Sequence, residues 1–382
     1  MTEGPDATRI TRLTLQDFRS YPALDLPVSR RLVALAGENA AGKTNLIEAI
    51  SLFTAGRGLR RAELGDMVRS GQDRFAVSVS LGERDDEHRL GVGLERSAED
   101  GRAVRLCRVD GADAPSPAAF AEHARVVWLT PDLDGLFRGP AGDRRRFLDR
   151  LVLAVDTRHA ARVAALERAL RSRNRLLEES GTETAWLGAV EREVAELGVA
   201  VASARRETAE RLDAEALAGR DDASPFPFAR LELAGEIDAL VATMPAVDAE
   251  DRFRALLRDG RARDAAAGRT LSGPQASDLV VRHGPKDLAA ATCSTGEQKA
   301  LLLGLVLAHA RLVAAMSGIA PLVLLDEVAA HLDPRRRAAL FDVLSRLRGQ
   351  VWMTGADPAL FDDLRGRADL FSVRPGSVTP LA

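Results

Sequence analysis

The sequence predicts an α/β fold in which a head built on a parallel sheet is interrupted by an inserted helical-hairpin arm domain. Three observations support this prediction. A glycine-rich loop follows an apolar strand near the N-terminus, two acids end an apolar strand near the C-terminus, and the segment between them has the apolar spacing of long helices. We expect residues 1–155 to form the N-terminal half of the head, residues 156–222 the arm, and residues 223–382 the C-terminal half.

The composition is that of a globular chain and excludes several classes of protein. Of the 382 residues, 46% are hydrophobic, and the longest apolar runs, at 301–307 and 322–325, are too short to cross a bilayer. The N-terminus has no basic region followed by an apolar run, so we expect a cytoplasmic protein with no membrane segment. Because the net charge is −3, binding to nucleic acid would have to depend on a local basic patch.

The glycine-rich loop has the pattern G-x-x-x-x-G-K-[ST] and lies between an apolar strand at 31–36 and an apolar helical pattern. In this context the loop amides and the helix N-terminus bind phosphate. We expect Lys43 to bridge the terminal phosphates and take part in catalysis, and the Thr44 hydroxyl to ligate magnesium, so ATP and Mg²⁺ are the predicted cofactors. The predicted nucleotide-binding residues of the loop are Gly37, Glu38, Asn39, Ala40, Ala41, Gly42, Lys43 and Thr44.

A pair of acids is expected to complete this site. Residues 322–325 are all apolar, as in a strand buried on both faces, and they lead directly into Asp326 and Glu327. Acids at the carboxyl end of a core strand lie where a parallel sheet binds its ligand. We expect Asp326 to hold magnesium, directly or through water, and Glu327 to orient or deprotonate the attacking water.

A second phosphate-binding segment precedes the long apolar helix that begins near residue 300. The Ser294 hydroxyl and the Gly296 amide can both donate to phosphate, and S-x-G-[EQ]-x-K before a helix resembles the signature motif of the ABC ATPase superfamily. The alternative is a simple serine cap followed by an acid. Residues 331–333 resemble the D-loop of the same superfamily, which adds Asp333 to the predicted nucleotide-binding residues. The resemblance implies a P-loop ABC-type ATPase head.

One loop and one signature per chain imply that a complete site needs two chains, and therefore a homodimer that forms on ATP binding. Thr354 is a further predicted nucleotide-binding residue. It stands where transporter-type members place a histidine, so we expect slow turnover.

Lysine is almost absent from the chain. Of 53 basic residues, only Lys43, Lys286 and Lys299 are lysines, and two of these lie in the motifs just described. A compact ammonium is not interchangeable with a planar guanidinium at a phosphate, which gives a physical reason for lysine at position 43.

The arm is predicted from apolar residues spaced by three and four in 163–177 and 187–201, with a turn at 180–182. We expect an antiparallel hairpin whose helices are each about 24 residues and roughly 36 Å long. Arginines and glutamates alternate on its faces, which is consistent with solvated charge pairs or with a track for DNA.

Several segments resemble the RecF family of bacterial DNA replication and repair proteins. They are residues 10–21, residues 37–50 and the stretch from Thr130 to Asp149. Three positions depart from the family pattern: Ala40, where a glycine is usual; Gly58 after Arg57, where the family tends to read R-S; and Gln275 after Gly273-Pro274, where it tends to read G-P-H-R. Alanine at position 40 is tolerable if its φ is negative.

This resemblance implies an ATP-dependent dimer that binds DNA at gaps and at junctions of single- and double-stranded DNA. It also implies that the dimer helps RecR and RecO to load RecA, and that slow hydrolysis releases the clamp. Arg19 is a predicted contact of the nucleotide phosphates. The candidates for DNA contact are Arg60, Arg61, Arg144, Arg145 and Arg146, with a solvated charged face as the alternative for each cluster.

Other functions share the same head chemistry. An SMC-type chromosome or repair ATPase needs much longer coiled coils, and a transporter motor needs a membrane partner and a shorter insert. A non-hydrolysing, ATP-gated scaffold would use Glu327 as a sensor.

Overall fold

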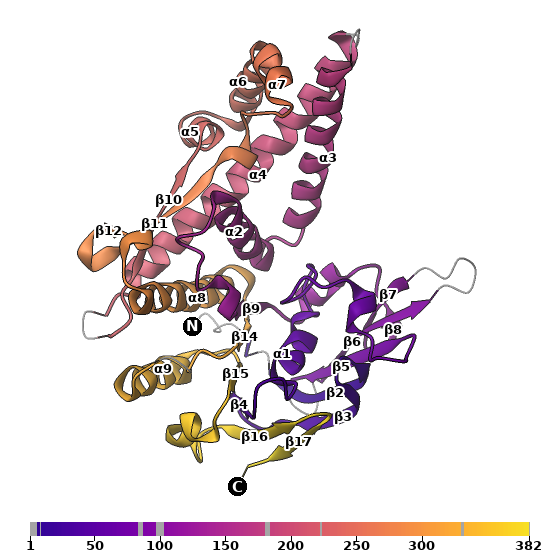
Figure 1. Cartoon of the computed structure of the whole chain (residues 1–382), viewed down its shortest axis with the longest axis vertical. Helices are drawn as coiled ribbons and strands as arrows, with labels where there is room; N and C mark the ends of the chain where they lie inside the picture. Colours follow the sequence, from indigo (N-terminus) through magenta and orange to yellow (C-terminus); the bar gives the residue numbers. More distant parts are fainter. Residues whose placement is uncertain are drawn as a thin grey trace. The chain divides into compact units, whose positions relative to one another are not determined.

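The computed structural model describes residues 6–7, 9–82, 87–96, 103–179, 184–221, 224–329 and 332–381. The chain divides into two compact units, whose helices and strands are labelled in Figure 1. The first unit comprises Met1–Asp134, Asp222–Phe226 and Val306–Ala382. The second unit comprises Gly135–Asp221 and Pro227–Leu305.

A six-stranded sheet of order β17-β16-β4-β15-β14-β9 forms one layer of the first unit. All neighbouring strands are parallel except β16 and β17. The central strands β4, β15 and β14 are buried along their whole length, as expected for strands covered on both faces. The bounds are β4 Leu32–Ala36, β9 Val126–Leu129, β14 Leu322–Leu325, β15 Val351–Gly355, β16 Asp369–Arg374 and β17 Ser377–Pro380.

A second six-stranded sheet, of order β3-β2-β5-β6-β7-β8, is antiparallel throughout. In β5, buried residues alternate with more exposed ones, so one face of the sheet is covered. The bounds are β2 Ile10–Phe18, β3 Tyr21–Pro27, β5 Phe75–Leu81, β6 His88–Arg96, β7 Ala103–Val109 and β8 Ala112–Asp113.

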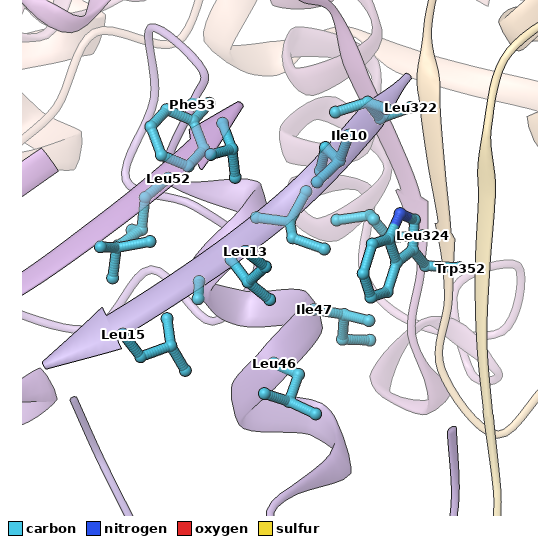
Figure 2. Packing of buried hydrophobic residues seen from close by; sticks show 14 of the residues in the cluster. Ile10, Leu13, Leu15, Leu46, Ile47, Leu52, Phe53, Leu322, Leu324 and Trp352 are labelled. Atoms are coloured by element: carbon cyan, nitrogen blue, oxygen red, sulfur yellow. The ribbon is translucent and has the colours of Figure 1, made fainter. Parts of the chain in front are cut away.

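Helix α1 (Lys43–Ser51) lies in the core that joins these two sheets (Figure 2). Ile47 on this helix has no exposed surface, and the same buried cluster contains Leu13 of β2 together with Leu324 and Trp352 of the parallel sheet. The glycine-rich loop runs directly into α1. The packing of this helix therefore fixes where the loop lies.

The remaining elements of the first unit are short strands and helices. Strands β1 and β13 pair in parallel. Their bounds, with those of the helices, are β1 Asp6–Ala7, β13 Ile319–Ala320, α9 Pro334–Arg346, and the 3₁₀ helices η1 Leu64–Met67, η3 Pro117–Glu122, η4 Pro131–Leu133 and η8 Pro358–Leu364.

The second unit is mainly helical, with one antiparallel sheet of order β10-β11-β12. Helix α8 (Thr295–Ser317) begins in this unit and ends in the first. The other bounds are α2 Ala141–Val155, α3 His159–Glu178, α4 Thr184–Ala218, α5 Glu236–Thr243, α6 Ala246–Asp259, α7 Arg261–Ala267, β10 Ala229–Ala234, β11 Asp278–His283, β12 Leu288–Ala289, η5 Pro274–Ala276, η6 Gly284–Lys286 and η7 Ala290–Thr292.

The inserted helical hairpin predicted from the apolar spacing is confirmed as α3 and α4, but the two helices are unequal. Helix α3 has 20 residues and α4 has 35, against the expected equal arms. The long helix continues because its C-terminal half packs on β10, where Leu212 is fully buried and the Asp213 carboxylate accepts a 2.7 Å hydrogen bond from the Leu231 amide. The predicted turn at 180–182 lies outside the described residues.

The two units are divided differently from the predicted domains. Residues 135–155 and 227–305 belong to the same compact unit as the arm helices, because β11 packs on α2 and β10 packs on α4. The predicted boundaries fall instead after residues 155 and 222. The division into domains 1–155, 156–222 and 223–382 stays a prediction.

Helix α8 is the one described helix that is long and apolar enough to cross a membrane. However, 67% of its most apolar window is buried inside the protein, as in the core helix of a soluble protein. Its length and composition are therefore accounted for by the fold.

Arg173, which falls on the apolar stripe of α3, is completely buried. Its guanidinium donates to the Asp264 carboxylate and the Thr270 hydroxyl at 2.8 Å each, to the Leu257 carbonyl at 2.6 Å, and to Glu191 at 3.2 Å. These partners come from α4, α6, α7 and the segment that follows α7. A buried guanidinium with four partners therefore ties the arm helices to the smaller helices around them.

Replacing Arg173 with methionine is expected to lower the free energy of unfolding by about 3–5 kcal/mol, because the buried Asp264 carboxylate loses its closest cation, whereas Glu191 keeps Arg261. The matched control is Arg171→Met on the exposed face of the same helix, for which we expect a change within about 0.5 kcal/mol. Urea unfolding followed by circular dichroism measures both variants. Equal stability of the two would contradict a structural role for the buried cluster.

Candidate nucleotide-binding site

The glycine-rich loop is folded tightly between β4 and α1, and two of its glycines are required by close contacts. Gly42 has a φ of 107°, and a Cβ there would lie 2.8 Å from both the Ser20 hydroxyl and the Tyr21 hydroxyl. The Tyr21 hydroxyl donates to the Gly42 carbonyl at 3.2 Å. At Gly37, a Cβ would lie 2.3 Å from the Val373 carbonyl oxygen. Residues of the neighbouring strands and of the turn before β3 therefore pack closely against both ends of the loop.

Ala40 adopts the left-handed conformation. Its φ is 65°, so the condition under which alanine would be tolerated here without strain, a negative φ, is not met. The loop must reverse direction between β4 and α1, and the backbone here does so with the geometry that a glycine would give. An L-residue in this region costs roughly 1–2 kcal/mol, so Ala40 is a strained residue within the loop.

Replacing Ala40 with glycine is expected to raise the free energy of unfolding by about 1 kcal/mol, because glycine adopts a positive φ without the steric clash. Ala41→Gly is the control. Ala41 is buried and is not among the positive-φ residues, so the same change is expected to destabilise the protein by roughly 0.5–1 kcal/mol. Thermal unfolding of both variants measures the sign. A loss of stability in Ala40→Gly would contradict strain at this position.

Lys43 lies under the loop with only 4% of its surface exposed. Its ammonium donates to the carbonyls of Gly37 at 2.7 Å and Glu38 at 2.8 Å, so the loop curls around the charge. Burial lowers the pKa of this ammonium, and the carboxylates of Glu327 and Asp326 oppose that change. An ammonium in this position can exchange these carbonyl partners for the oxygens of a phosphate that enters the loop.

Thr44, Asp326 and Thr354 meet at the carboxyl ends of the parallel strands. The Thr44 hydroxyl lies 3.1 Å from both oxygens of the Asp326 carboxylate, and the Thr354 hydroxyl donates to one of them at 2.6 Å. Burial raises the pKa of the Asp326 carboxyl, while these hydroxyl groups oppose the change. A buried carboxylate beside a threonine hydroxyl, at the mouth of a phosphate loop, is the hard-oxygen set that Mg²⁺ takes together with phosphate oxygens. The residues present therefore fit the expected metal.

Glu327 follows directly and has a φ of 51°. Its amide donates to the Thr354 hydroxyl at 2.9 Å, so the same threonine binds both members of the acid pair. Strained non-glycine residues of this kind concentrate at functional sites. The strain turns the chain sharply at the end of β14, directly after Asp326.

Replacing Asp326 with asparagine is expected to stabilise the free protein at neutral pH and to abolish stabilisation by Mg²⁺–ATP. Below about pH 3.8 the carboxyl is protonated in both the folded and unfolded states, so the variant has no advantage there. As the pH rises towards the raised folded-state pKa, the unfolded chain ionises first and the wild type loses stability relative to the variant. Melting temperatures with and without Mg²⁺–ATP across this pH range test the prediction. Equal Mg²⁺–ATP shifts in both proteins would contradict it.

Glu48 was not anticipated as part of the site. It has no exposed surface, and its carboxylate is held by Arg19 through two hydrogen bonds of 2.6 and 2.9 Å and by Arg60 at 3.1 Å. Arg60 also donates to Asn45, at 3.0 Å. Two arginines predicted to contact nucleotide or DNA are therefore bonded to the helix that carries the loop, and their predicted roles stay predictions. In the sequence, Glu48 could have been noticed as a single acid among the apolar residues of this helix.

The signature segment caps helix α8 in the second unit. The Ser294 hydroxyl lies 2.8 Å from the Glu297 carboxylate, which also accepts from the Ser294 amide at 2.9 Å. This is the capping arrangement considered as the alternative for the motif. Ser294 and Gly296 are nevertheless exposed, and so remain accessible to a phosphate. Capping and phosphate binding are therefore compatible roles for the same residues.

The carbonyl of Cys293, which precedes the signature, is fixed from two sides. Gln298 donates to it at 2.8 Å and Arg138 donates to it at 3.1 Å. Arg138 lies within the stretch 130–149 that resembles the RecF family. One local function of that stretch is therefore to hold the backbone at the start of the signature.

The arginine cluster at the start of α2 is largely committed to the second unit. Arg144 forms two 2.7 Å hydrogen bonds with Asp278, and only 15% of its side chain is exposed. Arg145 donates to the Ser277 carbonyl at 2.6 Å, and Arg146 pairs with Asp143. The first two arginines anchor α2 to β11, and DNA contact stays a prediction for all three.

Three further positions, Gly58, Arg61 and Asp333, lie outside the helices and strands. Asp333 caps α9 by accepting from the Arg336 amide at 2.9 Å, while His331 lies outside the described residues. Arg61 has a φ of 54° and lies beside Arg60. Gly58 has a φ of 74°, and a Cβ there would lie 2.9 Å from the Ser51 hydroxyl, which accounts for glycine at this departure from the family pattern.

At the other departure, the Gln275 amide donates to the carbonyls of Thr270 at 3.3 Å and Ser272 at 2.9 Å. Glutamine therefore closes its own turn at the position where the family tends to have a histidine.

Together, the phosphate loop, the buried carboxylate beside Thr44 and the capped signature segment define a P-loop, ABC-type ATPase head with an inserted helical arm. The sequence profile described as "RecF/RecN/SMC N terminal domain" matches residues 9–376. Curated proteins described as "DNA replication and repair protein RecF" are similar over almost the whole chain. Those from Mesorhizobium japonicum and Rhizobium meliloti are each 52% identical, covering 98% of this chain and 99% and 100% of the relatives. The chain belongs to the RecF family of DNA replication and repair proteins, within the wider RecF/RecN/SMC group.

Solved structures agree with the fold. A recombination mediator protein described as RecF–ATPrS in the RecFOR pathway has a TM-score of 0.86 at 20% identity, covering 99% of this chain and all of that one. An Smc head domain derived from Pyrococcus furiosus, bound to part of ScpA, has a TM-score of 0.53 at 18% identity, covering 98% of this chain and 96% of that one. The match to the RecF structure is the better of the two, as expected for a head with a short arm.

Proposed function

We propose that this protein is an ATP-dependent DNA clamp of recombinational repair and replication restart. Two copies close on ATP, with the phosphate loop of each chain facing the signature segment of the other. The observation that carries the proposal is that a single chain has one phosphate loop around Lys43 and one exposed signature segment at Ser294. A site that needs both segments is completed by a second copy related by a twofold axis.

The chemistry proposed for the site follows from the residues around the loop. Lys43 binds the terminal phosphates, and Thr44 and Asp326 hold Mg²⁺, which neutralises phosphate charge when bound. Glu327 orients or deprotonates the attacking water. Thr354 occupies the sensor position, but its hydroxyl is bonded to the Asp326 carboxylate and the Glu327 amide. A threonine cannot exchange a proton as a histidine does, so we propose weak ATPase activity that resets the dimer.

The DNA role is supported by membership of a family of DNA replication and repair proteins. We propose that the clamp works in the cytoplasm, binds gaps and junctions of single- and double-stranded DNA, and helps RecR and RecO to load RecA. Among the arginine candidates, Arg60, Arg61 and Arg146 are exposed, and the side chains of Arg60 and Arg146 are 41% and 60% exposed. Backbone phosphate contact is therefore better assigned to them than to Arg144.

Two alternatives differ in observable ways. An SMC-type ATPase brings distant sites together with long coiled coils, whereas α3 and α4, at 20 and 35 residues, reach only roughly 30 and 52 Å. A non-hydrolysing, ATP-gated scaffold would use Glu327 as a sensor. Under that alternative, Glu327→Gln leaves DNA binding and release unchanged. Under our proposal it prolongs the DNA-bound state.

The dimer is tested by light scattering on the full chain. We expect ATP with Mg²⁺ to double the mass, and Lys43→Ala to remain a monomer because the loop loses its phosphate-binding cation. The same mass with and without ATP would contradict the proposal.

DNA binding is tested with gapped, double-stranded and single-stranded DNA, each with and without ATP. We expect the tightest binding to gapped duplex in the ATP state, and a steep loss of affinity as salt increases, because phosphate contacts release counterions. Arg144→Ala is a control for general loss of structure, because this arginine anchors α2 to β11. Absence of a preference for any DNA would contradict the clamp and favour the scaffold.

A further inference from the structure

Lys286, the one lysine outside the sequence motifs, lies next to the signature segment. It ends the turn η6 between β11 and β12, where Asp287 follows with a φ of 50°. Its amide donates to the ring of the buried His283 at 3.3 Å, and its ammonium forms an ion pair with one carboxylate oxygen of Glu297. The turn thus brings Lys286 to a residue 11 positions further along the chain.

The other carboxylate oxygen of Glu297 is bonded to Ser294. It accepts from the Ser294 amide at 2.9 Å, and the Ser294 hydroxyl lies 2.8 Å away. The Ser294 hydroxyl therefore donates its proton to Glu297 of the same chain. A phosphate oxygen can accept this proton only if the hydroxyl turns away from Glu297.

The charge of Glu297 also works against phosphate binding. Lys286, followed by the bonds from Ser294, lowers the pKa of this carboxyl to about 2, so it is ionised at neutral pH. An anion 2.8 Å from the hydroxyl that is to meet a phosphate repels that phosphate unless a cation balances it. Lys286 supplies this cation, and 52% of its side chain is exposed.

The backbone of the segment is fixed independently of this pair. Gln298 and Arg138 donate to the Cys293 carbonyl at 2.8 and 3.1 Å, and neither bond involves Lys286 or Glu297. The Ser294 amide stays bonded to Glu297 whichever way the hydroxyl points. Rotation of the Ser294 side chain is thus the smallest change that lets its hydroxyl donate to phosphate.

We propose that Lys286 is a positioning residue for the composite ATP site. It holds and neutralises Glu297, so that the Ser294 hydroxyl can turn to the terminal phosphate bound by the second copy. This proposal rests on the proposed ATP-dependent dimer. It assigns a role to the one lysine that belongs to none of the sequence motifs, in a chain that otherwise uses arginine almost throughout.

Lys286→Met tests the proposal, because methionine keeps the length of the side chain and removes its charge. Each composite site is expected to lose roughly threefold to fivefold in affinity, so a dimer with two such sites weakens by roughly 10- to 25-fold, and more at low than at high ionic strength. Lys286→Arg keeps the charge and is expected to restore most of the association. Light scattering over a range of protein concentrations, with Mg²⁺–ATP, measures the dimer dissociation constant.

Arg282→Met is the matched control. Arg282 is a similarly exposed cation in the same hairpin, with 41% of its side chain exposed, but it pairs with Asp287 instead of Glu297. We expect its dimer to be as stable as the wild type. Equal weakening in Lys286→Met and Arg282→Met would overturn the proposal, because loss of any charge from this hairpin would then have the same effect.

Mixing two defective chains tests whether Lys286 acts on the site of the second copy. A Lys43→Ala chain has an intact Lys286 and signature, and a Lys286→Met chain has an intact loop, so their heterodimer contains one complete site. We expect this heterodimer to be roughly threefold to fivefold tighter than the one formed by Lys286→Met with the double variant Lys43→Ala/Lys286→Met, in which the intact loop faces a chain without Lys286. Fluorescent ATP is expected to bind the monomeric Lys286→Met chain as it binds the monomeric wild type. If that monomer binds ATP more weakly, or the two mixtures associate equally, action on the second copy is overturned.

The two proposals fail differently. If the wild type itself does not associate with ATP, the proposed dimer is wrong and the role of Lys286 falls with it. If the wild type associates and Lys286→Met associates equally well, only the role of Lys286 is overturned.

Discussion

The carboxylate of Asp326 is held between the hydroxyls of Thr44 and Thr354, and this contact depends on three separate parts of the chain. Thr44 is placed by the loop before α1, Asp326 by the end of β14, and Thr354 by β15. The contact forms because β14 and β15 pair in parallel, with Leu325 opposite Met353, so that both strands end at the same edge of the sheet. A shift of register by one residue would turn these side chains to the opposite face.

The site combines strain with a firmly packed support. Ala40 and Glu327 both have positive φ angles, and burial raises the pKa of the Asp326 carboxyl. Each of these features disfavours the folded chain by a small amount. The buried cluster around α1, which includes Ile47 and Trp352, stabilises the same unit (Figure 2). Bound Mg²⁺ would neutralise the buried charge of the Asp326 carboxylate. The backbone of the loop, including the strained Ala40, is already in place to contact phosphate.

Local patterns were enough to predict the phosphate loop, the acid pair and the two arm helices, because each depends on residues that are close in the sequence. Contacts between distant residues were not predictable in this way. Arg173 fitted an apolar stripe, and only the folded chain brings Asp264 to it. Arg144 was predicted to contact DNA or to lie on a solvated charged face, yet it pairs with Asp278, 134 positions away. The φ of Ala40 likewise depends on packing around the loop.

The most direct measurement is a crystal structure of the protein with Mg²⁺ and a slowly hydrolysed ATP analogue. The cation is expected at about 2.1 Å from the Thr44 hydroxyl, with the Asp326 carboxylate bound to it directly or through one water. The Ser294 hydroxyl of the partner chain is expected to contact the terminal phosphate. A nucleotide bound away from the loop, or a cation with no contact to Thr44 or Asp326, would contradict the assignment of this site.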